Sequence, residues 1–296
     1  MRRDRALVLS KHHGSGNDFL VVLAGFATGG QSGADLSSEE VRALCSRHRG
    51  VGADGLIIGT PGRDGAQLEM LLFNADGSTA EMSGNGIRCL VQAAVTKGAA
   101  PEGVVVVDTG GGRRRVAYRD AGDGLGFAEV DMGRFSVSET LDPHGRPVSL
   151  AGAGAVSRAC AVSVGNPHVV LLQGESRPDL EQCGPLIEAS VPGGANVELV
   201  QLRTSGELSM EVWERGVGMT EACGTGAVAA AAAARTWGLV DSVVDVTTAG
   251  GTLRVTLASD SATLAGPTRF VADVTVDTGH LQGLVTDRIE EPAPAP

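Results

Sequence analysis

The chain has little lysine and few aromatic residues. Only two of its 296 residues are lysines, Lys11 and Lys97, and aromatic residues make up 3% of the sequence. A pyridoxal-phosphate enzyme needs a lysine to form its Schiff base. Lys11 stands at the end of an expected strand and Lys97 at the end of an expected helix, so neither is a promising anchor. We therefore expect no cofactor of this kind, and none of another kind is indicated.

The net charge and the length of the apolar runs argue against binding to nucleic acid or to a membrane. The formal net charge is −11 at pH 7, whereas a nucleic-acid-binding surface is usually basic, and few aromatic residues are available for base stacking. The longest apolar run, residues 227–234, is too short and too alanine-rich to span a membrane. The first residues carry no apolar core of signal-peptide length. We expect a cytoplasmic protein that binds neither nucleic acid nor membrane.

The cysteines suggest neither a disulfide framework nor a metal site. There are five, at positions 45, 89, 160, 183 and 223, an odd number with irregular spacing. None of the pairs has the spacing of a zinc-binding CxxC motif. The adjacent His12 and His13 would point to opposite faces of a strand. We therefore expect no metal.

One short motif occurs twice. Residues 81–89 read EMSGNGIRC and residues 221–229 read EACGTGAVA, so that Glu-x-(Ser/Cys)-Gly-(Asn/Thr)-Gly recurs 140 positions later. A polar residue stands nine positions before the central residue in both copies, Asn74 before Ser83 and Glu214 before Cys223. The repeat spans about half the chain, far longer than the repeat of a solenoid. It indicates two similar domains that face each other.

The elements around the motif follow the same order in both halves. Hydrophobic periodicity and capping signals, such as Ser37 with Glu40 three residues later, predict strands and helices in each half. The expected strands lie at 5–10, 19–23, 55–59, 67–74, 103–109, 113–120, 160–172 (interrupted by a turn at Gly165-Asn166), 196–202 and 207–214, and the expected helices at 37–48, 84–98, 177–189 and 224–238.

This order predicts an α/β protein with mixed (α+β) sheets, built as two pseudo-symmetric domains with the active site in the cleft between them. We assign residues 1–128 to the first domain, completed by residues near 275–288, and residues 129–274 to the second. The boundary is expected near the glycine-rich hairpins at 120–134. The Pro/Ala-rich tail, residues 289–296, is expected to be disordered.

The repeated loop suits the binding of a carboxylate beside a reactive group. In each copy a strand ends and a helix begins at the two glycines. The first amides of a helix have no partner within the helix, and the helix dipole is positive there. A cysteine at that position is expected to have a lowered pKa. Two such loops facing each other could remove a proton α to a carboxylate on one face and return one on the other.

Four longer segments carry a family resemblance. HHGSGNDF, FNADGSTAEMSGNGIRC, GNPH and WERGVGMTEACGTGA resemble diaminopimelate epimerase, a pyridoxal-phosphate-independent amino-acid epimerase family of lysine and cell-wall biosynthesis, from about residue 11 to 275. The resemblance implies strands around a central helix in each domain, a two-base mechanism that uses two cysteines, a diaminopimelate substrate and a homodimer.

The resemblance also implies roles for individual residues. Cys223 matches one catalytic base, Ser83 stands at the position of the other, and His168 is near the site and could shape it. Glu214 and Arg215 match the pair that holds the distal amino and carboxylate groups, and a guanidinium fork suits a carboxylate. The remaining substrate-binding residues are the asparagines and the loop residues with their backbone amides: Asn17, Asn74, Asn166, Asn196, Gly84, Asn85, Gly224 and Thr225.

The sequence departs from the family at two positions. The family has cysteine where this chain has Ser83, and a serine hydroxyl is a much weaker acid than a thiol. The serine could be a natural variant in an asymmetric pair with Cys223, an engineered replacement, or the mark of a different activity. Cys89 is expected to face the core and not to substitute. Gly55 stands where some relatives carry a glutamine that touches substrate.

Two other functions are compatible with these departures. One is a racemase, epimerase or dehydratase that acts on another amino acid, such as a hydroxyproline. The other is a catalytically idle paralogue that only binds amino acids. A substrate panel separates the first from a diaminopimelate epimerase, because Arg215 has little to bind without a distal carboxylate.

Overall fold

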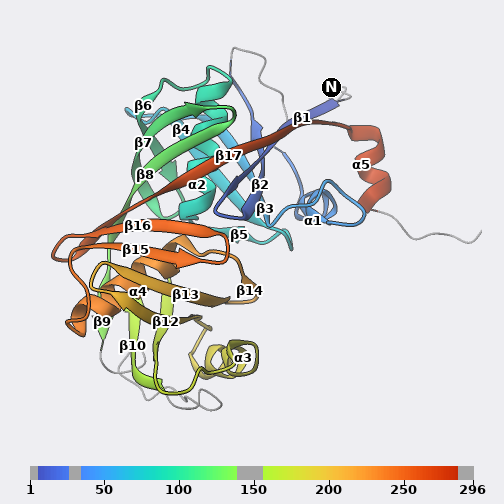
Figure 1. Ribbon diagram of the computed structural model, residues 1–296. Coiled ribbons are helices and arrows are strands. Elements are labelled where there is room, and N and C mark those ends of the chain that lie inside the picture. The colour runs from blue at the N-terminus through green and yellow to red at the C-terminus, as the bar shows by residue number, and fades with distance from the viewer. Residues whose placement is uncertain (1–5, 27–34, 139–155, 286–296) are drawn as a thin grey trace, which may run out of the picture.

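The computed structural model describes residues 6–26, 35–138 and 156–285. Two halves of similar build are stacked on each other, and a long strand near the C-terminus runs from one half to the other (Figure 1). Within the described residues, no helix has both the length and the apolar character needed to cross a membrane.

The first half contains the strands and helices up to residue 138. Its elements are β1 (Ala6–Gly14), β2 (Asn17–Leu23), α1 (Ser38–Cys45), β3 (Gly55–Pro61), β4 (Leu68–Asn74), β5 (Thr79–Ala80), α2 (Gly84–Thr96), β6 (Gly103–Thr109), β7 (Gly112–Gly122), β8 (Leu125–Arg134) and β9 (Ser136–Ser138).

The second half contains the elements from residue 156 onward. They are β10 (Val156–Ser163), β11 (Pro167–Gln173), α3 (Leu180–Ser190), β12 (Asn196–Thr204), β13 (Glu207–Glu214), β14 (Gly218–Thr220), α4 (Gly224–Thr236), β15 (Val243–Thr248), β16 (Gly251–Leu257), β17 (Ser261–Asp277) and α5 (Thr278–Val285).

The strand pairings repeat from one half to the other. In the first half β2 pairs with β3 in parallel, β3 with β4 antiparallel and β4 with β6 in parallel. In the second half β11 and β12, β12 and β13, and β13 and β15 pair in the same three ways. The pseudo-symmetric α/β fold with mixed sheets, predicted from the repeated loop, is therefore confirmed.

Two segments of the chain pass from one half into the other and pair with strands there. The first part of β17 pairs with β16 and with β8, and its later part pairs with β1. In the opposite direction, β9 follows β8 and pairs with β10. The predicted domain boundary after residue 128 falls within β8, and the assignment of residues to domains stays a prediction. The predicted tail lies outside the described residues.

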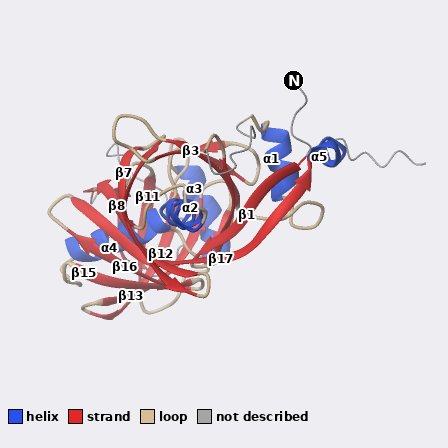
Figure 2. Cartoon of the chain, turned by 90° about the horizontal axis from the view of Figure 1, so that it is seen from above, coloured by secondary structure: helices blue, strands red, loops and turns tan. Residues whose placement is uncertain are grey.

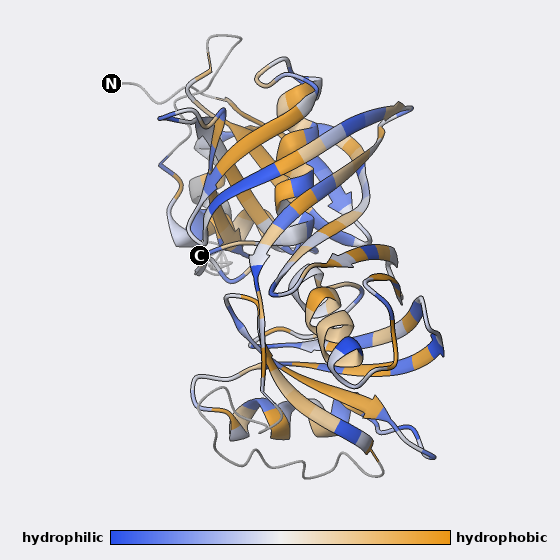
Figure 3. Cartoon of the chain, turned by 90° about the vertical axis from the view of Figure 1, so that its left-hand side faces the viewer, coloured by the Kyte–Doolittle hydropathy of each residue, from blue (hydrophilic) through white to orange (hydrophobic). Residues whose placement is uncertain are grey.

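Strands curl around α2 in the first half (Figure 2), and α4 in the second half contacts strands of its own half, from β10 to β13 and from β15 to β17. Both helices are coloured for hydrophobic residues over most of their length (Figure 3), and every residue of α4 from Gly224 to Ala234 is buried. The small alanine side chains let strands pack closely around this helix. One continuous core contains the buried faces of both helices.

The predicted helices form with small shifts at their ends. The capping box between Ser37 and Glu40 is present, but α1 ends at Cys45, before the predicted end at residue 48. α2 ends at Thr96 with Lys97 as its C-cap. Contrary to the sequence interpretation, Lys11 does not end a strand, because β1 continues to Gly14.

The two central helices begin against each other. An ideal Cβ on Gly84 would lie 3.5 Å from the Gly224 Cα, and one on Gly224 would lie 3.2 Å from the Gly84 Cα. The second distance is tighter than an ordinary van der Waals contact, so glycine at both positions eases this approach. The repeated loops therefore meet where the two halves join.

Candidate active site

A pocket of about 680 Å³ lies between the halves, at the starts of α2 and α4. The two predicted catalytic residues and the ten predicted substrate-binding residues line it, while their individual roles stay predictions. These residues are Ser83, Cys223, Asn17, Asn74, Gly84, Asn85, Asn166, Asn196, Glu214, Arg215, Gly224 and Thr225.

Ser83 and Cys223 are the N-caps of their helices. The Ser83 Oγ accepts a hydrogen bond from the Gly86 amide at 3.0 Å, and the Cys223 Sγ accepts one from the Gly226 amide at 3.4 Å. Both residues have extended backbone angles, as N-caps usually do. The same local structure therefore presents a hydroxyl on one side and a thiol on the other.

The amides next to these caps are not part of the helical hydrogen-bond ladder. The first backbone bonds of this ladder join the Ile87 amide to the Ser83 carbonyl and the Ala227 amide to the Cys223 carbonyl, each at 2.9 Å. The amides of earlier helical residues have no partner of this kind. Four of them can receive a carboxylate between the two helices: those of Gly84, Asn85, Gly224 and Thr225.

The expectation that the Cys223 thiol has a lowered pKa is wrong. Burial, followed by the charges of Glu214 and Glu198, raises its pKa well above the ordinary value. Hydrogen bonds from Thr225 and the Gly226 amide act in the opposite direction but are smaller. The lowering of the pKa expected from the helix terminus is thus smaller than the raising by burial and by two carboxylates. Cys223 is therefore a neutral thiol in the free protein.

Glu214 is the carboxylate at the end of β13. Burial raises its pKa, and the charge of Glu198 raises it further, while hydrogen bonds with Thr220 and Cys223 and the charge of His168 lower it. The Thr220 hydroxyl donates to the Glu214 Oε1 at 2.6 Å. Glu214 and Cys223 therefore influence each other's pKa.

Behind Cys223 lies a fully buried pair, His168 and Glu198. The His168 Nδ1 is 2.7 Å from the Glu198 Oε1, and its Nε2 is 2.9 Å from the Asn166 Oδ1, while the Asn166 Nδ2 donates to the Thr225 Oγ1 at 3.3 Å. His168 therefore links the buried Glu198 to Asn166 and, through Asn166, to Thr225 of the Cys223 loop.

The equivalent positions in the first half are apolar. Phe19 pairs with Gly55, which lies two residues before Ile57, and His168 pairs with Asn196, which lies two residues before Glu198. Phe19 and Ile57 therefore occupy the positions of His168 and Glu198. An ideal Cβ on the second glycine of each loop would lie 3.1 Å from the Ile57 Cδ1 and 2.7 Å from the Glu198 Oε1. The loop of Ser83 is therefore backed by apolar side chains, whereas the loop of Cys223 is backed by a histidine and a carboxylate.

Glu198 was missed in the sequence. It stands in the otherwise apolar strand segment NVELVQL, where a charged residue between buried neighbours is a signal of a polar contact. Sequence spacing does not indicate His168 as its partner, because the two residues belong to different strands, β11 and β12.

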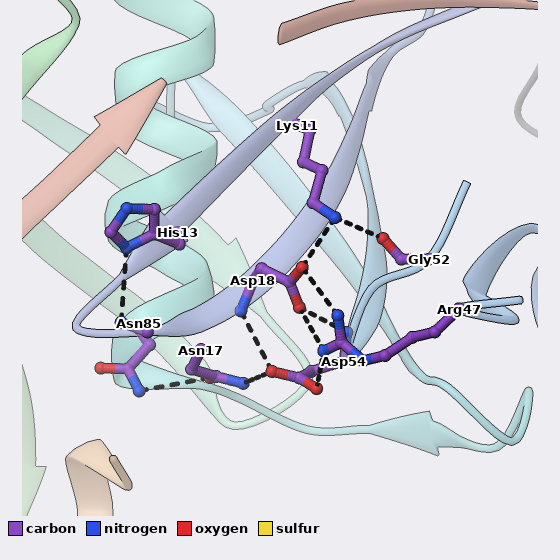
Figure 4. Close-up of polar contacts among 9 residues, drawn as sticks. Lys11, His13, Asn17, Asp18, Arg47, Gly52, Asp54 and Asn85 are labelled. Carbon is purple, nitrogen blue, oxygen red and sulfur yellow. Dashed lines mark hydrogen bonds and ion pairs between the residues drawn. The ribbon is translucent and has the colours of Figure 1, made fainter. Parts of the chain in front are cut away.

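A charged network supports the first half of the pocket (Figure 4). The Asn17 Nδ2 donates to the Asp54 Oδ2 at 3.0 Å. The Arg47 guanidinium binds both Asp54 and Asp18, and the Lys11 Nζ lies 2.8 Å from the Asp18 Oδ2. Burial would raise the pKa of Asp18, but the hydrogen bonds from Arg47 and Lys11 outweigh it and lower that pKa. Sequence reasoning missed this network, which holds Asn17 in place.

Asn85 links the two halves directly. Its Nδ2 donates to the Asn17 Oδ1 at 3.2 Å and to the Ala222 carbonyl at 3.1 Å. Ala222 directly precedes Cys223, so one buried amide connects the Ser83 loop to the Cys223 loop.

The remaining predicted residues are held at the wall of the pocket. The Asn196 Oδ1 accepts the Arg215 amide at 2.9 Å, and the Arg215 Nη1 donates to the Gly193 carbonyl at 3.1 Å. The Asn74 Nδ2 donates to the Ser78 Oγ at 3.0 Å. Arg215 and Glu214 thus both line the pocket, and the guanidinium of Arg215 is held at Gly193.

The structure also locates Cys89, the possible substitute for the missing cysteine, and Gly55. Cys89 is fully buried in the core, where burial raises its pKa to about 12, and it does not line the pocket. An ideal Cβ on Gly55 would lie 2.5 Å from the Phe73 carbonyl oxygen. A larger residue at position 55 would require the neighbouring backbone to move.

His12 and His13 have separate partners. The ring of His12 bonds with Gln92 and Ser10, and burial lowers its pKa to about 4. The His13 Nδ1 accepts the Gly16 amide at 3.3 Å. Across the described ranges, no group of three or more histidine, cysteine, aspartate or glutamate side chains is placed to hold a metal ion.

The sequence is similar to that of one known family over most of its length. The profile of the family described as Diaminopimelate epimerase matches residues 9–137 and 160–282. A diaminopimelate epimerase from Synechococcus sp. (strain JA-2-3B'a(2-13)) is 40% identical over 262 residues, covering 84% of this chain and 90% of the relative. One from Cupriavidus pinatubonensis is 37% identical, covering 93% of this chain and 99% of the relative.

Solved structures of lower sequence identity share the fold. A hydroxyproline epimerase from Agrobacterium vitis superposes with a TM-score of 0.67 at 18% identity, covering 94% of both chains. A phenazine biosynthesis protein of the PhzF family from Bacillus anthracis gives a TM-score of 0.65 at 15% identity, covering 92% of this chain and 99% of that one. At these identities the likeness concerns the architecture alone.

Proposed function

The chain belongs to the diaminopimelate epimerase family, and on that premise we propose that it interconverts LL- and meso-2,6-diaminopimelate in lysine biosynthesis. The reaction removes a proton from Cα and returns one to the opposite face without a cofactor. The observation that carries this proposal is the placement of Ser83 and Cys223, each capping a helix, on one pocket between the halves.

The reacting carboxylate of the substrate would bind between the two helix starts. The four free amides there can hold its oxygens, and they would also stabilise the negative charge that moves onto the carboxylate when Cα loses its proton. At the other end of the substrate, Arg215 would hold the distal carboxylate, and Glu214 with the pocket asparagines the distal ammonium.

Cys223 would act as the base after passing its proton to Glu214. The thiol is neutral in the free protein, so it must lose its proton before it can accept one from Cα. The raised pKa of Glu214 and its electrostatic interaction with Cys223 support Glu214 as the acceptor. The positive charge of the bound α-ammonium would favour this transfer. The thiolate then takes the Cα proton, and Glu214 later releases its proton to solvent.

Ser83 would supply the proton on the opposite face. A serine hydroxyl is too weak an acid to remain as an alkoxide. It would therefore give its proton to Cα while taking one from a water molecule in the pocket, and the proton that Glu214 releases neutralises the hydroxide that is left. Only the Cys223 side of the substrate then has an effective base. The two stereoisomers should therefore exchange their Cα proton with solvent at different rates.

Deuterium wash-in tests the proposed reaction. In D2O, wild-type protein incubated separately with each stereoisomer should introduce deuterium at Cα, measured by mass spectrometry. Cys223→Ala should lower this rate by about 10²- to 10⁴-fold, the usual contribution of a general acid–base group. If wild-type protein at high concentration introduces no deuterium, the proposal is wrong. If Cys223→Ala exchanges at the full rate, the thiol is not the base.

The same assay separates the alternative functions. An enzyme for hydroxyproline should exchange that amino acid faster than diaminopimelate and be insensitive to Arg215→Gln. An idle binding protein should be stabilised against heat by diaminopimelate without any exchange. The pairing of Glu214 and Arg215 in the pocket favours a substrate with charged groups at both ends.

The family resemblance also supports a homodimer and a cytoplasmic location, which we include in the proposal. Light scattering at several protein concentrations tests the dimer, and a mass of one chain at every concentration would contradict it. Fractionation of cells tests the location.

A further inference from the structure

Arg88 is a buried cation in the second turn of α2. Its side chain is fully buried, and no carboxylate of the described residues is recorded as its hydrogen-bond or ion-pair partner, while its Nε has no partner there. Burial lowers the pKa of its guanidinium to about 10, so the group remains charged at neutral pH. A buried charge without a counter-ion is costly and calls for a function.

The guanidinium holds the residues of the Ser83 loop. The Arg88 Nη1 donates to the Gly84 carbonyl at 3.1 Å, and its Nη2 donates to the Asn85 Oδ1 at 2.9 Å. Because Arg88 occupies this oxygen, the Asn85 Nδ2 is directed towards Asn17 and Ala222. The orientation of the amide that links the two loops therefore depends on Arg88.

The space around Arg88 is shaped for this group. An ideal Cβ on Gly14 would lie 2.9 Å from the Arg88 Nη2, and one on Gly266 would lie 3.3 Å from its Cζ. Gly14 ends β1, and Gly266 lies on the strand β17 that runs between the halves. Both strands thus carry a glycine where they pass the guanidinium, and the guanidinium occupies the space that a side chain would fill.

The second half has no equivalent charge. Aligning the two loops places Val228 opposite Arg88. The cation is therefore found behind Ser83, while the carboxylates of Glu198 and Glu214 are found around Cys223. This asymmetry matches the difference between the two proposed proton-transfer groups.

We propose that Arg88 is a positioning residue: it orients Asn85 so that the two catalytic loops stay joined, and it places positive charge one helical turn behind the amides that receive the reacting carboxylate. The inference rests on the proposed function. The charge is more valuable in the transition state, where the carboxylate gains electron density, than in the bound substrate. Loss of Arg88 should therefore lower kcat more than it raises KM.

Arg88→Met and Arg88→Lys test this role, with Gln92→Met as the matched control. Gln92 lies one turn further along the same helix, is equally buried and bonds with His12 and Thr268, away from the loops. Arg88→Met should lower kcat by about 10- to 100-fold, as loss of a supporting contact commonly does, with KM changed by less than about 3-fold, roughly 0.65 kcal/mol. Gln92→Met should leave kcat within about 3-fold of wild type.

Arg88→Lys distinguishes an effect of the positive charge from an effect of side-chain volume. It also tests the proposed role if Arg88→Met does not fold. Burial lowers the pKa of a lysine below its usual value of about 10.4. The kcat of Arg88→Lys should therefore fall as the pH rises through that lowered pKa, while wild-type kcat should not show this step. A purely structural role would leave the pH profile unchanged.

The outcomes for Arg88 and for the proposed function are distinguishable. If wild-type protein introduces no deuterium, both inferences fail together. If wild type exchanges and Arg88→Met keeps its kcat and KM, or Gln92→Met loses as much kcat, or Arg88→Lys keeps the wild-type pH profile, only the role of Arg88 is overturned.

Discussion

The Nδ1 of His168 lies 2.7 Å from the Oε1 of Glu198, and neither side chain is exposed to solvent. The pair lies behind Cys223, and the corresponding positions behind Ser83 are the apolar residues Phe19 and Ile57. The two halves therefore repeat a backbone but not an electrostatic environment.

Removing the charge of Glu198 should make Cys223 easier to ionise. The Glu198 carboxylate raises the pKa of Cys223 and of Glu214, so Glu198→Gln should shift both values downward. Alkylation of Cys223 by iodoacetamide, followed by mass spectrometry against pH, should then reach half its maximum rate at a lower pH than in wild type. Ile57→Val, at the equivalent position of the first half, should leave the profile unchanged. An unmoved profile in Glu198→Gln would show that Cys223 does not respond to this charge.

Replacing Ser83 by cysteine should maintain or raise turnover. A thiol has a pKa of about 8.5 and can serve as both acid and base, whereas a serine hydroxyl cannot. The cap should survive, because Cys223 already accepts the equivalent amide of Gly226 in the second half. The measurement is kcat in both directions, and the ratio of the two wash-in rates should move towards one. A large loss of turnover would instead establish serine as a specific requirement.

Asp18 should stabilise the fold in a pH-dependent manner. Its pKa is lowered in the folded state by the hydrogen bonds of Arg47 and Lys11, which outweigh burial. A lowered pKa contributes stability above the unfolded value of about 3.9 and loses it as the pH falls through the folded value. Asp18→Asn should therefore cost about 2 kcal/mol at pH 7, the usual size for charge-assisted hydrogen bonds.

Urea unfolding at pH 7, 5 and 3 measures this contribution. The stability difference between wild type and Asp18→Asn should be largest at pH 7 and smallest at pH 3. Asp108→Asn removes an exposed ion pair with Arg113 and should have little effect at any of the three values. A difference for Asp18→Asn that stays constant with pH would contradict the assignment.

Much of the fold could be predicted because its signals are local. The repeated Glu-x-(Ser/Cys)-Gly-(Asn/Thr)-Gly loop predicts two helix starts, and both form with Ser83 and Cys223 as N-caps. The polar residues nine positions earlier, Asn74 and Glu214, end the strands β4 and β13 and line the same pocket. Caps, turns and periodicity depend on residues a few positions apart, and a sequence displays these directly.

The sequence by itself determined the duplicated architecture and the helix starts, and through the family resemblance it indicated twelve of the residues that line the pocket. Only the tertiary structure decided that Cys223 has a raised rather than a lowered pKa, that Glu198 meets His168, and that Asn85 links the two halves through Ala222. These features depend on burial and on charges brought from strands far apart in the chain. A group's surroundings set the energy of its charged state, and those surroundings exist only once the two halves have packed together.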